Sequence, residues 1–360
     1  MRIFHVLGTR PNFVKMAPLI AALRTRMPDS DQVIVHTGQH YDRMMSEIFF
    51  EQLGVPEPDH MLEIGSGTHA QQTARVMERL EPLLIADRPD MVIVPGDVNS
   101  TVAAALTAVK LGIPVGHLES GLRSWDRTMP EEINRILTDA IADDLYVHSE
   151  EALGNLAREG IPAEKAHFVG NTMIDSLVAL QDRFKPLEAC REFGLTPGGY
   201  LLVTLHRPAL VDGPLLFEAI AALNLVAADI PVLFPVHPRT KAKLDAEGAE
   251  IAPGLNLVDP VGYLEFLSLE SDAAAVLTDS GGIQEETSYL GVPCFTLRDN
   301  TERPVTVELG TNTMLGLDPA RIPEITGLLV EKAGDPSTPP PLWDGRASER
   351  IAELIATREV

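Results

Sequence analysis

The chain has 360 residues, of which 45% are hydrophobic and 22% charged, and this balance excludes a disordered or fibrous protein. Its length suggests about two domains. Because only 29 basic residues stand against 52 acidic ones, neither nucleic acid nor an anionic membrane is expected as a partner, and an anionic ligand needs a local cluster of cations.

The N-terminal segment and the cysteines indicate in which cell compartment the protein works. The first residues resemble a buried strand rather than a signal peptide, and no stretch approaches the roughly 18 apolar residues of a membrane span. Cys190 and Cys294 lie far apart in the chain and predict neither a disulfide framework nor a zinc site. We therefore expect a cytoplasmic protein.

Short apolar runs alternate with amphipathic stretches in the first half, and this pattern predicts a doubly wound parallel sheet. The expected strands are Ile3–Leu7, Gln32–His36, Met91–Pro95, Pro114–Leu118 and Asp144–His148. The expected helices are Met16–Met27, His69–Asp87, Thr101–Leu111 and Ile133–Ala142. Ligands bind at the carboxyl ends of strands in such sheets, so the polar turns after the strands are candidate sites.

The same alternation restarts near residue 200. The expected strands are Leu201–Leu205, Val232–Val236, Leu255–Val258, Ala273–Thr278 and Val292–Leu297, and Lys185–Gly199 is the candidate linker. The predicted fold class is therefore α/β, with two Rossmann-like domains at 1–185 and 186–345. Residues 346–360 are expected to form a helix that packs back on the domains, because Ile351, Leu354 and Ile355 form an apolar stripe.

Two turns have the residue types of an anion site. In GTRPNFVKMAP, the backbone N–H groups at a helix start, with Arg10 and Lys15, would attract an anion, although an ordinary turn with surface cations explains the pattern equally well. In TDSGGIQEE, Ser280, Gly281 and Gly282 offer a hydroxyl and bare amides to a phosphate, and Glu286 could hold ribose hydroxyls.

Carboxylates and histidines follow other strands. Asp97, Glu119 and Glu131 are candidate acid–base groups, although helix capping is the alternative for Asp97 and Glu131. His206 and His237 end strands of the second half, where structural and catalytic histidines are equally common.

The ordered series GTRP…K, TGQH, GD, HxESGLRS, PEEINR, GN, HR, HPR, DSGGIQEE and TERP resembles the non-hydrolysing UDP-N-acetylglucosamine 2-epimerases. The resemblance implies a GT-B-type fold with the active site in a cleft between two domains, no cofactor, no catalytic metal and a homodimer. It implies epimerisation at C2 of a UDP-sugar by elimination of UDP to a 2-acetamidoglucal and re-addition.

Carried over residue by residue, the resemblance implies three groups of site residues. The catalytic group is Asp97, Glu119, Glu131 and His206. The substrate-binding group is Arg10, Lys15, Arg135, Arg207, His237, Ser280, Gly281, Gly282, Glu286 and Arg303. Gln39 and His40 correspond to the region where a second UDP-GlcNAc activates bacterial members, although the Tyr41-Asp42 that follows departs from their pattern.

Three other functions stay open at this point. Ala209-Leu210 replaces the usual acid and Asn after the HR pair, so a hydrolysing 2-epimerase that releases UDP and a free 2-acetamido sugar is one alternative. A GT-B glycosyltransferase is another, because similar DSGG-to-acid motifs occur there. A nucleotide-sugar-binding regulator without catalysis is the third.

Overall fold

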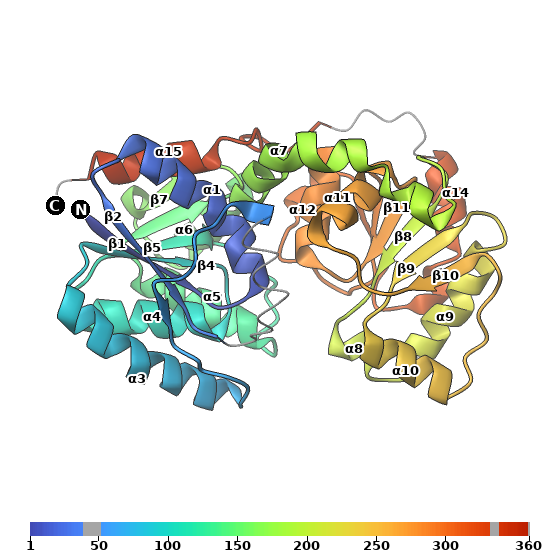
Figure 1. Ribbon diagram of the computed structural model, residues 1–360, viewed down its shortest axis with the longest axis horizontal. Helices are drawn as coiled ribbons and strands as arrows, with labels where there is room; N and C mark the ends of the chain where they lie inside the picture. The colour runs from blue at the N-terminus through green and yellow to red at the C-terminus, as the bar shows by residue number, and fades with distance from the viewer. Residues whose placement is uncertain (39–51, 332–337, 359–360) are drawn as a thin grey trace. The chain divides into compact units, whose positions relative to one another are not determined.

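The computed structural model describes residues 1–38, 52–331 and 338–358, which form two α/β units (Figure 1). Unit 1 comprises Met1–Val178 and Pro341–Val360, and unit 2 comprises Ala179–Pro340. Each unit is a parallel sheet with helices on both faces, which confirms the predicted pair of Rossmann-like domains of the GT-B fold class.

The sheet of unit 1 has the strand order β3-β2-β1-β4-β5-β6-β7, with every pairing parallel. Its strands are β1 Arg2–Leu7, β2 Asp31–His36, β3 His60–Met61, β4 Met91–Pro95, β5 Val115–Ser120, β6 Asp144–Val147 and β7 Ala166–Phe168. The sequence predicted all of these except the two edge strands β3 and β7, which are too short to form an apolar run.

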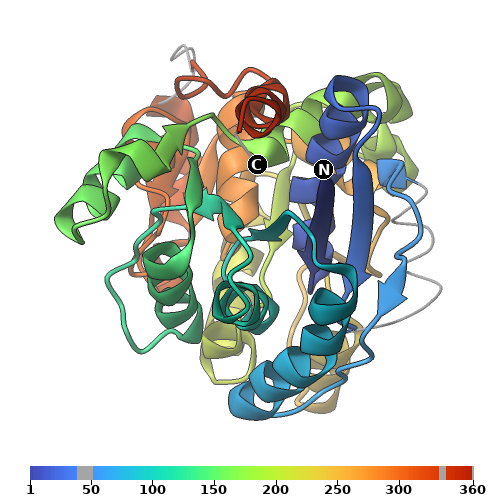
Figure 2. The same ribbon diagram turned by 90° about the vertical axis from the view of Figure 1, so that its left-hand side faces the viewer.

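Helices cover both faces of this sheet. They are α1 Arg10–Arg26, α3 His69–Asp87, α4 Asn99–Lys110, α5 Pro130–Ile141, α6 Glu150–Arg158, α7 Thr172–Phe184 and α15 Ala347–Ala356, with the short η1 Ala163–Lys165. The C-terminal α15 packs beside α1 on one face, and α3 and α4 pack on the other (Figure 2). Each helix described in either unit is too short or too polar to cross a membrane.

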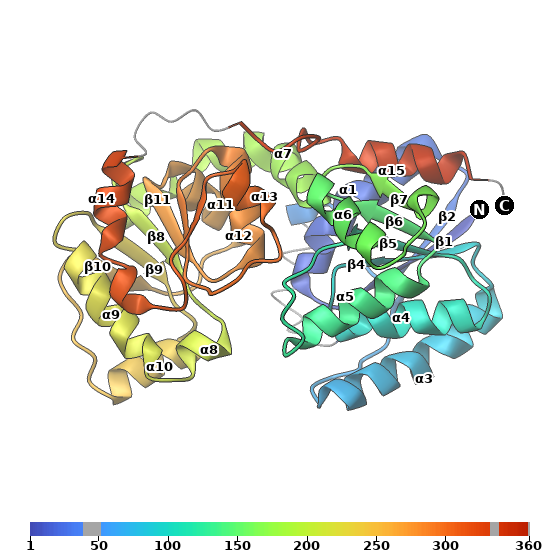
Figure 3. The same cartoon turned by 180° about the vertical axis from the view of Figure 1, so that it is seen from behind.

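The sheet of unit 2 has the order β10-β9-β8-β11-β12-β13, again all parallel. Its strands are β8 Leu201–Thr204, β9 Val232–Pro235, β10 Leu255–Val258, β11 Ala275–Thr278, β12 Cys294–Thr296 and β13 Asn312–Met314. Its helices are α8 Pro208–Val211, α9 Leu215–Val226, α10 Pro238–Ala246, α11 Tyr263–Asp272, α12 Gly281–Leu290, α13 Val305–Glu308 and α14 Glu324–Glu331, with η4 Pro319–Arg321 (Figure 3).

The segment expected to be a linker is folded into unit 2. Its two short helices, η2 Lys185–Leu187 and η3 Ala189–Phe193, pack against α11, and the Cys190 side chain is fully buried. The chain passes from unit 1 to unit 2 within α7, between Val178 and Ala179. Local composition missed this because a continuous helix gives no Pro or Gly signal where it leaves one domain for another.

Strand order fixes where each unit can bind a ligand. In unit 1 the order reverses between β1 and β4, and in unit 2 it reverses between β8 and β11. At such a switch point the loops after the two strands diverge to opposite faces and leave a crevice at the carboxyl edge. The turns after β1, β4, β8 and β11 therefore lie at the two most favourable positions for a site.

We predict that α15 is needed for the stability of unit 1. Ile351 is fully buried in the core that α15 shares with α1, so Ile351→Ala should lower the free energy of unfolding by about 2–5 kcal/mol. Both tryptophans, Trp125 and Trp343, belong to unit 1, so fluorescence during urea unfolding reports this unit.

The matched control is Glu353→Ala on the same helix. Glu353 pairs with Arg26 at 2.7 Å, but the two side chains are 56% and 52% exposed, so its loss should change the unfolding free energy by at most about 1 kcal/mol. Equal effects of the two substitutions would contradict the structural role given to α15.

Candidate functional site

Glu119 stands on a bulge at the end of β5. Leu118 pairs with Tyr146 and Ser120 pairs with Val147 of β6, so Glu119 is an extra residue in the ladder. Its φ of +65° lies in the left-handed region, which is unfavourable for a residue with a Cβ. Bulges of this kind re-aim a side chain next to a functional site.

The Glu119 carboxylate forms a nearly buried ion pair with Lys15 of α1. The Lys15 ammonium donates to Glu119 Oε2, and the two side chains are only 10% and 9% exposed. A Cβ added at Gly96, after β4, would lie 3.4 Å from both Glu119 Oε2 and Lys15 Nζ. Gly96 therefore lies against this pair at the switch point, and Lys15, expected as a cation for the ligand, has a carboxylate partner.

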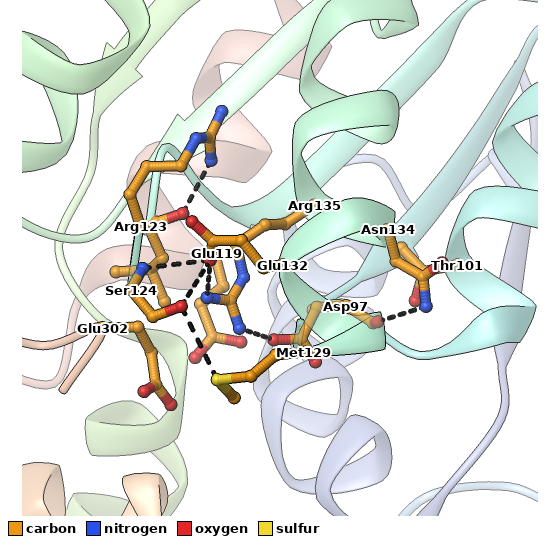
Figure 4. A network of polar contacts seen from close by, with 12 residues as sticks. Asp97, Thr101, Glu119, Arg123, Ser124, Met129, Glu132, Asn134, Arg135 and Glu302 are labelled. Carbon is orange, nitrogen blue, oxygen red and sulfur yellow. Dashed lines mark hydrogen bonds and ion pairs between the residues drawn. The ribbon is translucent and has the colours of Figure 1, made fainter. Parts of the chain in front are cut away.

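Arg135 of α5 joins two further carboxylates (Figure 4). Its guanidinium donates to Asp97 Oδ2 and, at 2.7 Å, to Glu132 Oε2. Glu132 is fully buried and also accepts hydrogen bonds from Ser124 N and Oγ and from Trp125 N. With four donors, Glu132 holds the loop after β5 in place, a structural role that its neighbour Glu131 does not share.

Glu131 lies at the first turn of α5, where a carboxylate is favoured by the helix dipole. It is half-buried, and within the described part of the chain no hydrogen bond or ion pair involves its side chain. Because successive helix residues point about 100° apart, Glu132 can be saturated by protein donors while Glu131 keeps its carboxylate for a ligand.

Backbone N–H groups of the GTRPN turn are hydrogen-bonded within the turn itself. Asn12 Oδ1 accepts hydrogen bonds from Gly8 N and Thr9 N, both at 3.1 Å, and α1 begins six residues before the predicted Met16 because of this capping turn and Pro11. The two amides are therefore used by Asn12. The side chain of Arg10 and the whole of Gln39 and His40 lie outside what the structure describes.

In unit 2, Asp279 anchors the turn after β8. Its carboxylate accepts from His206 N at 2.9 Å and Arg207 N at 2.7 Å, and His206 Nδ1 lies 3.0 Å from Oδ1. Burial, the largest influence, raises the pKa of Asp279, but the hydrogen bond and charge of His206 with the backbone N–H groups outweigh it and lower the pKa. An ionised Asp279 orients a His206 ring that stays 60% exposed.

Ser280 begins α12 at the same switch point. Its side chain makes no capping hydrogen bond to the described helix, so the hydroxyl and the first N–H groups of α12 are available to a ligand. Arg303 lies against Gly281, where a Cβ would clash with the guanidinium. Arg303 also pairs with Glu302 and, at 3.0 Å, with Glu285. The structure thus brings Ser280, Gly281 and Arg303 together.

Glu286 of α12 belongs to a buried acidic group with Glu270 of α11. Burial is the main reason that the pKa of Glu286 is raised to about 8; the charge of Glu285 also raises it, and the hydrogen bond that Tyr263 Oη donates at 3.3 Å opposes it. Burial, with the charge of Glu286, raises the pKa of Glu270 well above its ordinary range. Tyr263 and Glu270 lie seven residues apart, on one face of α11.

His237 lies at the same edge but does not join this cluster. Its ring is exposed at the start of α10, where Nδ1 accepts from Arg239 N at 3.2 Å. Arg207 Nε donates to Asp279 O at 2.8 Å, and burial chiefly lowers its pKa. Of the cations that the resemblance places in the site, Lys15, Arg135 and Arg303 are paired with protein carboxylates, and Arg207 donates to a carbonyl.

Sequence reasoning passed over Asn12, Asp279, Glu270 and Tyr263 and left Glu132 out of the site. Asp279 was signalled by its place in TDSGG, directly after a strand, whereas Glu270 and Tyr263 depend on the packing of two helices. Among the described residues, no group of three or more His, Cys, Asp and Glu side chains is arranged to hold a metal ion.

Comparison with known proteins gives a consistent match over the whole chain. A family model described as UDP-N-acetylglucosamine 2-epimerase matches residues 22–356. The UDP-N-acetylglucosamine 2-epimerase of Methanocaldococcus jannaschii is 41% identical over 365 residues, which cover 99% of each chain. The UDP-2,3-diacetamido-2,3-dideoxy-D-glucuronate 2-epimerase of Pseudomonas aeruginosa is 41% identical over 366 residues, again 99% of each.

A solved structure is equally similar. The crystal structure of the M. jannaschii UDP-GlcNAc 2-epimerase, in complex with UDP-GlcNAc and UDP, has a TM-score of 0.89 and 41% identity, covering 99% of this chain and 100% of that one.

We predict that Glu270 destabilises unit 2 near neutral pH. Both carboxyl oxygens are buried, and no hydrogen-bond partner exists for them within the described residues. Glu270→Met should therefore raise the free energy of unfolding by about 1–3 kcal/mol, measured by urea unfolding with far-UV circular dichroism.

The pH dependence has a definite sign. Since the folded-state pKa of Glu270 is raised, the wild-type protein regains stability as pH falls towards the ordinary range of Glu, and the advantage of Glu270→Met should shrink. Leu269→Met on the same helix, an exchange of one buried apolar side chain for another, should change stability little at any pH. A destabilised Glu270→Met protein would contradict the role given to Glu270.

Proposed function

The chain belongs to the UDP-N-acetylglucosamine 2-epimerase family, and from this we propose that it inverts C2 of UDP-N-acetylglucosamine to give UDP-N-acetylmannosamine without net hydrolysis. The observation that carries the proposal is the group of three carboxylates, Asp97, Glu119 and Glu131, at the carboxyl edge of the unit 1 sheet. Inversion of a carbon requires proton transfer on both of its faces, and carboxylates are suited to that task.

The chemistry proceeds by elimination because C2 has no neighbouring carbonyl to acidify its proton. One carboxylate removes the C2 proton, the C1–C2 double bond forms, and the C1–O bond breaks with release of the UDP anion. In the second half, a diphosphate oxygen adds back to C1 while a carboxyl group delivers a proton to the opposite face of C2. Atoms and charge balance over the cycle, so neither a redox cofactor nor water is consumed.

The residues of unit 1 divide these tasks. Glu119 is held by Lys15 and Asp97 by Arg135, so both carboxylates have fixed positions, whereas Glu131 has no partner within the described part of the chain. A general acid or base must lie within hydrogen-bond distance of the proton that it transfers, whatever its pKa. We assign the proton transfers to Glu119 and Glu131, with Asp97 and Arg135 contacting the sugar.

The residues of unit 2 bind the leaving group. The Ser280 hydroxyl and the amides of Gly281 and Gly282 cradle the diphosphate at the start of α12, and Arg303 lies against this turn. The exposed His206 ring, oriented by Asp279, stabilises charge that develops on the departing diphosphate. Glu286 holds the ribose hydroxyls. Arg207 and His237 supply further contacts from the ends of β8 and β9.

The proposal requires both sets of residues to act on one substrate molecule. Four further points remain predictions. The resemblance implies Arg10 as a further cation, activation by a second UDP-sugar at Gln39 and His40, and a homodimer, and a cytoplasmic location is expected from the sequence.

A second substrate has support from one observation. The P. aeruginosa protein, named for a 2,3-diacetamido glucuronate sugar, is as similar to this chain as the M. jannaschii UDP-GlcNAc enzyme. The alternative is therefore 2-epimerisation of that UDP-sugar. Comparing kcat/KM for the two substrates distinguishes the two, since a hydrogen-bonding site rejects a substrate that leaves its polar groups unpaired.

The test of the proposed reaction is incubation with UDP-N-acetylglucosamine in deuterated water, followed by proton NMR. Deuterium should enter at C2 of both UDP-sugars because the removed proton exchanges with solvent. Free UDP accumulating in step with a reducing sugar would identify a hydrolysing enzyme, and product only after an acceptor is added would identify a glycosyltransferase.

Glu119→Gln and Glu131→Gln should each lower kcat by about 100-fold or more, because each removes one proton-transfer group. Glu151→Gln is the control, since this carboxylate lies in the first turn of α6 and accepts from Ser149 Oγ. Binding of UDP-N-acetylglucosamine without turnover in the wild-type protein would instead support a regulator.

Ser280→Ala should weaken UDP binding by about tenfold, the effect of losing one hydrogen bond to a charged group. Isothermal titration calorimetry with UDP measures the change. Ser271→Ala, in the same unit, removes a hydroxyl that donates to Ser268 O and should leave UDP affinity intact. Unchanged affinity for Ser280→Ala would remove this hydroxyl from the diphosphate site.

A further inference from the structure

His117 of β5 is buried completely between two acceptors. Its Nδ1 lies 2.7 Å from Asp139 Oδ1 on α5, and its Nε2 lies 2.7 Å from the carbonyl oxygen of Gly96, which follows β4. Both distances are those of hydrogen bonds, and a hydrogen bond needs one proton between its two heavy atoms.

The protons of both bonds must come from the imidazole ring. A carbonyl oxygen only accepts, so Nε2 must carry a proton. Asp139 Oδ2 accepts from Arg123 Nη1 at 2.7 Å and from Gly121 N at 3.0 Å, as an ionised carboxylate does. Burial, the largest influence, raises the pKa of Asp139, but the bonds and charges of His117 and Arg123 outweigh it and lower the pKa.

We propose that His117 is a doubly protonated imidazolium that positions the acid–base residue Glu119 and the sugar-contacting Asp97, an inference that rests on the proposed function. It is a positioning residue, since its ring is enclosed by protein.

The two bonds of the ring tie together the two turns that carry the carboxylates. Gly96 has a φ of +66°, directly precedes Asp97 and faces the Lys15–Glu119 pair. On the other side, Asp139 accepts from Gly121 N, two residues after the bulge at Glu119. A neutral ring can donate to only one of these partners and would leave the other acceptor without a proton.

The surrounding charges balance the buried cation. Asp139 faces His117 from α5, and Arg123 faces Asp139 from the loop after β5. Arg123 in turn pairs with Glu159 after α6, through Nε to Oε1 at 2.7 Å and Nη2 to Oε2 at 2.5 Å. Two cations and two carboxylates therefore alternate, which is the arrangement that makes buried charge tolerable.

The first test uses the wild-type protein with ¹⁵N-labelled histidine. Nitrogen–proton correlation spectra above neutral pH should show an N–H signal for both nitrogens of one ring, and His117→Gln should remove both. His5, equally buried on the same sheet, is the internal control: burial chiefly lowers its pKa to about 4, so it should show one N–H signal. A single N–H signal from His117 would overturn the inference, whatever the protein catalyses.

The second test measures positioning. His117→Gln should lower kcat about 10- to 100-fold, because a small displacement of reacting groups has that effect, while UDP affinity stays the same. Asp139→Asn, which keeps the side-chain shape, should reduce the ring to one N–H signal and lower kcat similarly. His5→Gln should keep kcat.

The two tests separate the inference from the proposed function. A doubly protonated His117 in a protein that epimerises neither UDP-sugar would refute the proposed function and leave the imidazolium in place. Full kcat in folded His117→Gln or Asp139→Asn protein would overturn the positioning role and leave the proposed function in place.

Discussion

The candidate site depends on one electrostatic constraint, which is that each charge taken out of water needs a partner of opposite sign. Lys15 with Glu119, Arg135 with Glu132, and Arg303 with Glu285 meet this requirement at the carboxyl edges of the two sheets. Breaking such a pair leaves an uncompensated charge, which costs far more than the pair itself contributes. The pairs therefore fix side-chain positions more than they stabilise the fold. Glu270 is the exception among the described residues, because its carboxyl oxygens have no hydrogen-bond partner there, and burial with the charge of Glu286 raises its pKa well above the ordinary range.

The backbone also departs from regular geometry where these charged side chains meet. The backbone of Glu119 is in the left-handed region, and the residue is not paired with β6. The backbone of Gly96 is in the same region, and this glycine lies against the Lys15–Glu119 pair. This left-handed conformation departs from regular strand geometry; it is unfavourable for Glu119, which has a Cβ, and readily adopted by Gly96. Such exceptions persist where the surrounding packing over-determines them, and here the parallel pairings of β4 and β5 do so. The local departures from regularity coincide with the residues to which we assign the chemistry.

Much of this arrangement was predictable because buried parallel strands are apolar runs that end in polar turns. The ten expected strands exist, and the turns that follow them hold the residues singled out by type. What the sequence could not predict is the partner of each charge. Lys15 and Glu119 are 104 residues apart, and they meet because β1, β4 and β5 are neighbours in the sheet. Glu132 and Glu131 are adjacent and chemically identical, and the donors of Ser124, Trp125 and Arg135 to Glu132 distinguish their tasks.

The position of α15 has a consequence for how the molecule is made. The apolar face of α1 near Ile20 and Leu23 is covered by Ile351 and Ile355, which the ribosome adds only after the whole of unit 2. Unit 1 begins synthesis first but closes its core last, so during translation a nascent chain carries an uncovered hydrophobic helix while unit 2 is already complete.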